Sequence, residues 1–256
     1  MGDWNSDQYL KFKKDRTLPS IDLVNRIDLK APKRIIDIGC GPGNSTEILK
    51  NKYPDAYVLG ADFSPNMIEK AKSRHSDIDF MIFDASKDFE KLDGKFDIVF
   101  SNACIQWVPN HKKLLGDMMN ILNPNGIMAV QVPINEEQIV HKIIKKVTDY
   151  KKWKNKFTST REFYTLTECE YFDLLSDITN DFYLWKTIYC HRMPSHKSII
   201  EWYKGTALRP YLDILNDTEK TEFENDILTE LKKEYPVQSN GEIIFRFPRL
   251  FFTAIK

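Results

Sequence analysis

A glycine-rich loop that joins an apolar segment to a helical one constrains the fold of this 256-residue chain more than any other feature. Residues 34–38 are typical of a buried parallel strand, and Gly39, Gly41 and Gly43 follow directly. Glycine tolerates positive φ and allows a backbone to approach a ligand closely. A tight turn without a ligand would also explain three glycines, but between a strand and a helix they indicate a ligand-binding turn of an α/β sheet.

The first half of the chain alternates between strand and helix patterns. Short apolar runs predict strands at residues 57–61, 80–83, 96–100 and 127–132, and apolar residues at helical spacing predict helices at 45–53, 65–71 and 114–122. Ser64 as N-cap, followed by Pro65, marks the start of the second of these helices. This alternation is typical of βαβ units, in which helices cover both faces of a parallel sheet.

The second half of the chain is mainly helical. Helix patterns at 139–147, 171–175, 195–204 and 218–234 accompany strand patterns at 182–190 and 249–255. We therefore expect one domain over residues 1–256, with a core at 1–135, a helical cap from 136–180 and 195–240, and the last two strands returning to the sheet. The expected fold is α/β and Rossmann-like, with a mostly parallel seven-stranded sheet and helices on both faces.

The charge balance limits the kinds of partner. The chain has 37 Lys and Arg against 37 Asp and Glu, so it lacks the basic surplus of a protein that binds nucleic acid or anionic membranes. The lysine-rich stretch at 142–156 is interpreted as a solvated helix face.

Cysteine spacing and the start of the chain bear on the compartment. Four widely spaced cysteines predict reduced thiols rather than disulfides or a zinc site. The sequence has neither an apparent secretory leader nor a long apolar run, so we expect a cytoplasmic protein without a metal.

Two carboxylates follow the second and third predicted strands. Asp62 lies 19 positions after Gly43, where a carboxylate can accept hydrogen bonds from both hydroxyls of a ribose, and Asp84 has the equivalent place one strand later. Ligands of open parallel sheets bind at the carboxyl ends of the strands, so these residues and the glycine loop predict a nucleoside site. Asn44 occupies the third glycine position of the dinucleotide fingerprint, which disfavours a pyrophosphate cradle.

The segment Asp37-Ile38-Gly39-Cys40-Gly41-Pro42-Gly43-Asn44 resembles motif I of the class I S-adenosylmethionine methyltransferases. The resemblance implies a class I methyltransferase fold, with S-adenosylmethionine as cofactor and S-adenosylhomocysteine as product. It places the glycines beside the methionine moiety, Asp62 at the ribose, and Asp84 with Ala85 at the adenine. The implied cofactor-binding residues are Asp37, Gly39, Gly41, Gly43, Asn44, Asp62, Phe63, Asp84, Ala85 and Asn102.

Further segments, spread over nearly the whole chain, resemble the trans-aconitate methyltransferases. They are Asp3-Trp4-Asn5, Gln106-Trp107, Tyr189-Cys190-His191-Arg192-Met193-Pro194-Ser195-His196, Leu208-Arg209-Pro210 and Phe247-Pro248-Arg249-Leu250-Phe251. That family esterifies one carboxylate of a small tricarboxylate. The resemblance implies substrate contacts by Trp4, Gln106, Trp107, Tyr189, His191, His196, Arg209 and Arg249. The lysine-rich stretch and Ile134 depart from the family pattern.

A carboxylate acceptor simplifies the chemistry that the protein must provide. With a pKa near 4 the acceptor is deprotonated at neutral pH, so we expect no catalytic acid or base and a mechanism of proximity and orientation. Arg209 and Arg249 could each grip a carboxylate through paired hydrogen bonds. The expected partner is thus a small anionic substrate, bound by a monomer.

Other interpretations remain open at this stage. The acceptor could be a nitrogen, a carbon or a phenol oxygen, and an amine or phenol would call for a nearby base. A nicotinamide-dependent oxidoreductase and a cofactor-binding module without catalysis are two further possibilities. Arg209 and Arg249 could equally be surface ion pairs, and His191 and His196 structural histidines.

Overall fold

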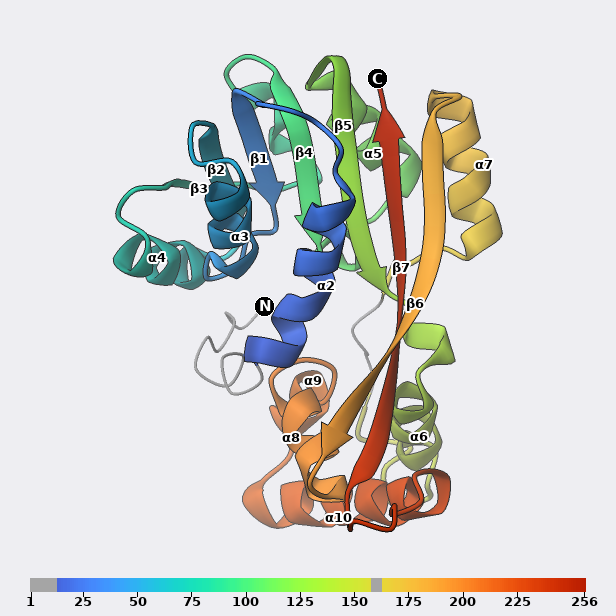
Figure 1. The fold of residues 1–256 in the computed structure, drawn as a ribbon. Helices are drawn as coiled ribbons and strands as arrows, with labels where there is room; N and C mark the ends of the chain where they lie inside the picture. The colour runs from blue at the N-terminus through green and yellow to red at the C-terminus, as the bar shows by residue number, and fades with distance from the viewer. Residues whose placement is uncertain (1–12, 158–162) are drawn as a thin grey trace.

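Seven strands form one sheet in the order β3-β2-β1-β4-β5-β7-β6 in the computed structural model, which describes residues 13–157 and 163–256 (Figure 1). The strands are β1 (Arg34–Ile38), β2 (Tyr57–Asp62), β3 (Asp79–Ile82), β4 (Phe96–Asn102), β5 (Leu122–Pro133), β6 (Phe182–Met193) and β7 (Ile243–Ile255). Strands β1 to β5 are parallel, and β7 lies antiparallel between β5 and β6. From β1 the strand order runs to β2 and β3 on one side, and to β4 and β5 on the other. The carboxyl ends of β1 and β4 are therefore the topological switch point, where ligands of such sheets bind.

Helices cover both faces of this sheet. Helices α2 (Lys13–Arg26) and α3 (Asn44–Lys52) lie over one face, and α4 (Pro65–Arg74) packs on the β2–β3 edge (Figure 1). Helices α5 (His111–Asn120) and α7 (Glu168–Ile178) share the opposite core with the sheet. Ser64 caps α4 by accepting from the Met67 N–H, as the sequence predicts.

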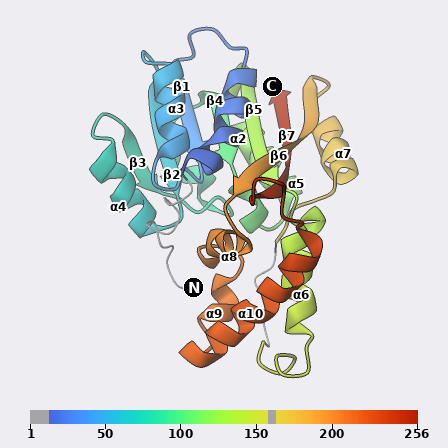
Figure 2. The same ribbon diagram turned by 60° about the horizontal axis from the view of Figure 1, so that its bottom comes forward.

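The remaining helices form a cap beyond the carboxyl ends of the parallel strands (Figures 1 and 2). They are α6 (Ile139–Thr148), α8 (His196–Lys204), α9 (Arg209–Leu212) and α10 (Asp217–Glu234). Single turns of 3-10 helix, η1 (Asp88–Lys91), η2 (Ile105–Trp107) and η3 (Asn135–Glu137), lie in the connections after β3, β4 and β5. The long strands β6 and β7 stay paired from the sheet into the cap, and so connect the two parts of the molecule (Figure 1).

One hydrophobic core runs from the sheet into the cap. Phe100 on β4, Phe245 on β7 and Phe223 on α10 all belong to it and are fully buried. Burying a phenylalanine side chain contributes about 1.5–3 kcal/mol, so α10 is held firmly on the extended strands. This shared core fixes the cap relative to the sheet.

The lysine-rich stretch is only partly a solvated face. Three of its lysines pair with acids of α10: Lys146 with Glu230, Lys152 with Asp226 and Lys156 with Glu219. Hydrogen bonds from Lys146, Lys233 and Tyr150 lower the pKa of Glu230 to about 2. These pairs attach α6 and the turn after it to α10.

The seven-stranded, mostly parallel fold is confirmed, but several boundaries differ from the expected ones. Helix α2 was not predicted, because Pro19 and many charged residues hide its apolar stripe. Strand β7 begins at Ile243 rather than at 249, since Pro248 lies inside a central strand, where proline is unusual. Strand β5 begins at Leu122 rather than at 127, so it includes the segment Asn123-Pro124-Asn125-Gly126 that precedes the expected strand.

The range 136–180 also divides differently from the expected cap. Its first part is α6, which contacts α10 in the cap. Its second part is α7, whose buried Tyr171 and Leu175 pack in the sheet core together with α5. Hydrophobic patterns show that a helix has an apolar face, but they do not show which core receives it.

Candidate active site

The glycine loop after β1 has the strained backbone that its sequence predicts. Gly39, Gly41 and Gly43 have φ of 79°, 53° and 89°, a region that other residues rarely adopt. A Cβ on Gly39 would lie 2.2 Å from the Sγ of Cys104, so no side chain fits between the loop and the segment after β4. The loop is tied to β2, because the Gly39 N–H donates to the Ala61 carbonyl and the Gly41 N–H donates to Asp62 Oδ2, at 2.7 and 2.9 Å.

Asp37 supports this loop from behind. Its Oδ2 accepts hydrogen bonds from Ser45 Oγ at 2.6 Å and Thr46 Oγ1 at 2.7 Å, which hold the start of α3. The side chain is fully buried, and burial raises its pKa to about 6 despite the two hydrogen bonds. Asp37 lies outside the walls of the cavity in front of the loop, so the structure makes it a support for the loop rather than a ligand contact.

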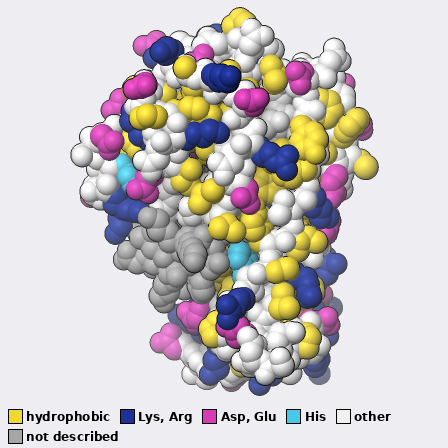
Figure 3. Space-filling view, in the orientation of Figure 1, with side chains coloured by type: hydrophobic (Ala, Val, Ile, Leu, Met, Phe, Trp, Pro, Cys, Tyr) yellow, Lys and Arg dark blue, Asp and Glu magenta, His cyan; other side chains and the backbone are white. Residues whose placement is uncertain are grey.

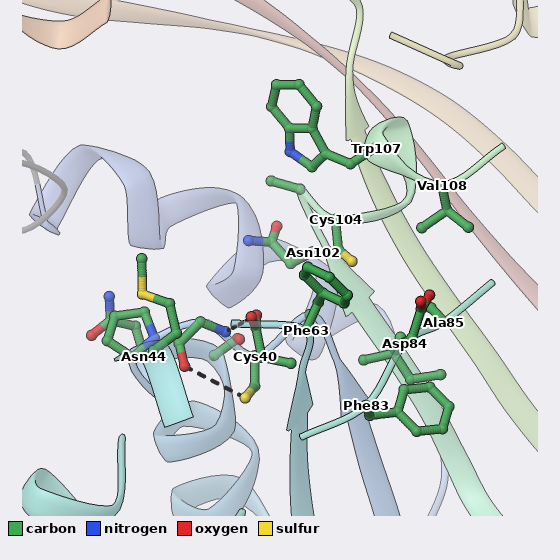
Figure 4. Close-up of a pocket in the computed structure, with 18 of the residues that line it drawn as sticks. Cys40, Asn44, Phe63, Phe83, Asp84, Ala85, Asn102, Cys104, Trp107 and Val108 are labelled. Carbon is green, nitrogen blue, oxygen red and sulfur yellow. Dashed lines mark hydrogen bonds between the residues drawn. The ribbon is translucent and has the colours of Figure 1, made fainter. Parts of the chain in front are cut away.

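A cavity of about 600 Å³ lies in front of the glycine loop at the carboxyl ends of β1, β2 and β4. We call it the cofactor cavity, and its size is within the usual range for small-molecule sites. Cys40 and Asn44 lie at one side of it and Phe83, Asp84 and Ala85 at the other, with Trp107 beyond Asn102 and Cys104 (Figure 4). Of the predicted cofactor residues, the lining contains Gly39, Gly41, Asn44, Asp62, Phe63, Asp84, Ala85 and Asn102.

The lining chemistry fits a nucleoside. Phe63 is 63% exposed although its neighbours are largely buried, which leaves an aromatic face open to a base. Burial raises the pKa of Asp84, but hydrogen bonds from Ser86 and Lys87 outweigh this and bring it below its ordinary value, so the carboxylate is ionised at neutral pH. The Asp62 carboxylate lines the cavity and accepts from the Gly41 and Ser64 N–H groups, so its oxygens lie at the carboxyl end of β2, where a ribose can bind.

Gly43 does not face this cavity. It is the N-cap of α3, and a Cβ there would lie 2.6 Å from the His75 ring. Its glycine character is therefore explained by close packing against His75 and Phe80 as well as by its positive φ.

A second, smaller cavity of about 90 Å³ adjoins the first at Ala103 and Trp107, which line both. We call it the acceptor chamber. Its lining comes from the sheet, the connections and the cap, and consists of Ala103, Gln106, Trp107, Pro133, Asn135, His141, Phe163, Trp202, Tyr203, Thr206, Ala207, Phe247 and Arg249. Because Ala103 and Trp107 line both cavities, groups bound in the two cavities would lie next to each other.

Arg249 supplies the positive charge of the acceptor chamber. It lies on β7 opposite Pro133 of β5, is only 5% exposed, and its guanidinium carbon lies 4.1 Å from the centroid of the Phe247 ring. It is the one arginine or lysine among the chamber's described lining residues. A guanidinium with aromatic packing on one side is well placed to grip a carboxylate.

Gln106 and Trp107, which the sequence predicts as substrate contacts, also lie in the chamber wall. Both belong to η2, directly after β4, and the Trp107 ring packs on Phe163 with 4.7 Å between centroids. Gln106 donates to the Ala103 carbonyl, and its buried Oε1 has no hydrogen-bond partner among the described residues. That oxygen is available to a donor on a bound molecule.

Four other predicted substrate residues lie outside the walls of both cavities. The Tyr189 hydroxyl donates to Asp22 of α2, and the His191 ring packs among aromatic side chains of β7 and α8. His196 Nε2 bonds to the Tyr235 carbonyl at 2.8 Å, and Arg209 pairs with Asp213 on its own helix. These contacts give each side chain a structural role, which corrects the expectation. Trp4 lies outside the described residues.

His141 and Asn135 are two of the chamber-wall residues that the sequence did not predict. His141 lies on α6 beside the apolar stripe of buried Val140 and Ile144, just before the lysine-rich stretch, and that pattern gives no sign of its position. Asn135 begins η3 just after β5. The strand-end argument that identified Asp62 could have found Asn135, because β5 ends at Pro133.

Charged surface patches, metal-ligand groups and membrane-spanning helices are the other features of the described part of the chain that bear on function. Figure 3 shows basic and acidic side chains interspersed over the face that it draws. The described residues contain no group of three or more histidine, cysteine, aspartate or glutamate side chains placed to hold a metal ion. No helix in the described part of the chain is both long and apolar enough to cross a membrane.

Comparison with known proteins gives consistent matches. A model of the methyltransferase domain family matches residues 29–191. Trans-aconitate 2-methyltransferases of Escherichia coli (strain K12 / DH10B) and Shigella flexneri are 36% identical over 254 residues, which is 99% of this chain and 98% of theirs.

Solved structures match in fold. The YcgJ protein of Bacillus subtilis is similar with a TM-score of 0.62 at 16% identity, covering 93% of this chain and 98% of that one. Phosphoethanolamine N-methyltransferase 2 of Haemonchus contortus, in complex with phosphomonomethylethanolamine and S-adenosylhomocysteine, has a TM-score of 0.59 at 17% identity, covering 93% and 52%. At these identities the structural matches show the Rossmann-like fold.

Proposed function

Because this chain belongs to the trans-aconitate methyltransferases, a family of S-adenosylmethionine-dependent enzymes, we propose that it methylates a carboxylate of trans-aconitate or a close analogue. The observation that carries the proposal is the buried Arg249 in a chamber that adjoins the cofactor cavity at Ala103 and Trp107. An anionic acceptor held there would have its oxygen beside the cofactor cavity.

The cofactor cavity suits S-adenosylmethionine on the grounds of its own residues. Asp62 and Asp84 would hold the ribose and adenine, and Phe63 would cover the base. Gly39 and Gly41 line the cavity and, without side chains, would let the backbone approach the amino-acid part. When bound, this cofactor supplies a methyl group on a positively charged sulfur that oxygen nucleophiles can attack.

Within the acceptor chamber, the protein has to bind, orient and exclude water. Arg249 would neutralise and align a carboxylate of the acid, while Trp107 and Phe247 enclose it. Burial lowers the pKa of His141 to about 4, so its imidazole is neutral at pH 7. A carboxylate already carries the electron pair that attacks the methyl group, so the reaction needs positioning rather than a base.

Turnover with purified protein tests this proposal. Incubation with S-adenosylmethionine and trans-aconitate should give a monomethyl ester and S-adenosylhomocysteine, detected by mass spectrometry.

Arg249→Gln should raise the KM for the acid by about tenfold or more, since a hydrogen-bonded charge pair is lost, and should leave S-adenosylhomocysteine affinity unchanged. Arg192→Gln is the control, because Arg192 is an exposed arginine that pairs with Glu242 on the surface. The absence of any ester at millimolar acid would refute the acceptor assignment.

We also infer that the enzyme is cytoplasmic and acts as a monomer of one domain. All four cysteines are free thiols, as in a reducing compartment. The core that joins sheet and cap is continuous within the described part of the chain. Sedimentation of the purified protein at micromolar concentration should give the mass of a single chain.

A further inference from the structure

The acceptor chamber continues into a third cavity on the side of α6. This outer cavity has a volume of about 500 Å³ and shares Asn135, His141, Phe163 and Ala207 with the chamber. His141 and Asn135 therefore lie where the two spaces meet, on elements different from the β7 strand that carries Arg249. A molecule larger than the 90 Å³ chamber could extend from Arg249 past these two side chains.

His141 and Asn135 both present polar atoms that no described residue engages. The His141 ring contacts Phe163 and Tyr203 edge-on, with centroids 5.1 and 5.4 Å apart, and neither ring nitrogen has a hydrogen bond to a described residue. Asn135 is 6% exposed, and its buried Nδ2 has no hydrogen-bond partner among the described residues. Buried polar atoms are nearly always satisfied, so the unpaired Asn135 Nδ2, with the half-buried His141 ring on the same wall, indicates a polar ligand.

We propose that His141 and Asn135 form a second carboxylate subsite, so that the acceptor is held at two carboxylates, one here and one at Arg249. This inference rests on the proposed function and deepens it. The imidazole N–H and the amide N–H would each donate to the same carboxylate. Two separated anion sites would favour di- and tricarboxylic acids over monocarboxylic acids, because only the former can satisfy both.

The surroundings of His141 make binding at this subsite depend on pH. Burial keeps the free imidazole neutral, with its pKa lowered to about 4, and a bound carboxylate favours the protonated form. The charged and titratable groups around it come from every neighbouring element: Arg249 from β7, Tyr203 from α8, Tyr211 from α9, Glu136 from η3, and Lys145, Asp149 and Lys154 from α6 and the turn after it. The two acids and two lysines of the outer cavity balance in charge. Binding of the acid should therefore be accompanied by proton uptake, and the uptake should increase as the pH falls.

Titration calorimetry tests the subsite directly. Protein saturated with S-adenosylhomocysteine is titrated with trans-aconitate and with the monocarboxylate crotonate, at pH 5.5 and 7.5, in buffers of different ionisation enthalpy. The wild type should bind trans-aconitate more tightly at pH 5.5, with proton uptake. His141→Gln should lose the proton uptake and about ten- to hundredfold in affinity for trans-aconitate, as expected for a lost hydrogen bond to a charge, but keep its affinity for crotonate.

Two further variants distinguish a failure of the proposed subsite from a failure of the proposed function. Asn135→Ser should lose affinity for trans-aconitate but keep the proton uptake, and Lys152→Gln, which removes an exposed lysine paired with Asp226, should match the wild type in both. If trans-aconitate is methylated but His141→Gln and Asn135→Ser leave its affinity and its preference over crotonate unchanged, the subsite is refuted while the proposed function stands. If trans-aconitate neither binds nor reacts with the wild type, the proposed function itself fails.

Discussion

The buried carboxylate of Asp37 gives a quantitative prediction about stability. Asp37 is fully buried and hydrogen-bonded to Ser45 and Thr46, yet burial raises its pKa from 3.8 to about 6. Replacement by asparagine keeps the shape and can keep one acceptor and one donor for the two hydroxyls. The change therefore removes mainly the ionisation, and the pH dependence of stability should report it.

The direction and size of this pH dependence follow from the protons that Asp37 binds in the folded and unfolded states. Below pH 3.8 the carboxyl is protonated both folded and unfolded, and above pH 6 it is ionised in both. Between these values only the folded state holds the proton, so this group makes the free energy of unfolding fall as pH rises. The pKa difference corresponds to about 3 kcal/mol in total, and about 2 kcal/mol of it falls between pH 4.5 and 7.

Urea denaturation at pH 4.5 and pH 7.0 measures this effect. The difference in unfolding free energy between wild type and Asp37→Asn should change by about 2 kcal/mol between the two pH values, with the wild type relatively more stable at pH 4.5. The other carboxylates are common to both proteins and cancel in the comparison. Parallel stability curves for the two proteins would refute the argument that Asp37 is neutralised by burial.

Three further changes test the loop and the cap. Gly39→Ala places a Cβ 2.2 Å from the Cys104 Sγ at a φ of 79°, so it should lower the free energy of unfolding by more than about 1 kcal/mol. Calorimetry should also show weaker binding of S-adenosylhomocysteine, and an unchanged affinity would contradict the role of this loop in binding. Glu230→Gln should remove stability that the wild type has above pH 4.5 and loses as pH falls towards 2, and thermal melts at pH 7 and pH 3 should show a smaller pH effect in the variant than in the wild type. Trp153→Phe removes the indole hydrogen bond to Asp226 and should lower the free energy of unfolding by about 2 kcal/mol, measured by urea denaturation. A change of less than about 0.5 kcal/mol, which is usual for a surface substitution, would indicate that this hydrogen bond does not hold α10.

The sheet and the cofactor cavity were predictable because their signals are local. Each parallel strand is a short apolar run, and its functional residue follows at the strand end, as Asp62 and Asp84 do. The backbone of the glycine loop is also a local property, since φ is positive at Gly39, Gly41 and Gly43. Only the placement of Asp37 and Gly43 behind the loop required the structure.

The acceptor chamber was harder to predict because it depends on contacts between distant segments. Arg249 reaches the chamber because β7 pairs with β5 over residues 249–255. Arg209 instead lies on the short helix α9, where it pairs with Asp213. No pattern near either arginine distinguishes these outcomes. His141 enters the wall because α6 packs its buried apolar face on α10 in the shared core, with ion pairs such as that of Lys146 with Glu230 beside it.

A crystal structure with S-adenosylhomocysteine and trans-aconitate tests the central claim most directly, namely that the acid binds in the chamber beside the cofactor cavity. The account predicts electron density for the acid in contact with Arg249, with one carboxylate oxygen directed past Ala103 and Trp107 towards the cofactor sulfur. Density for the acid outside the chamber, with Arg249 contacting only protein, would contradict it.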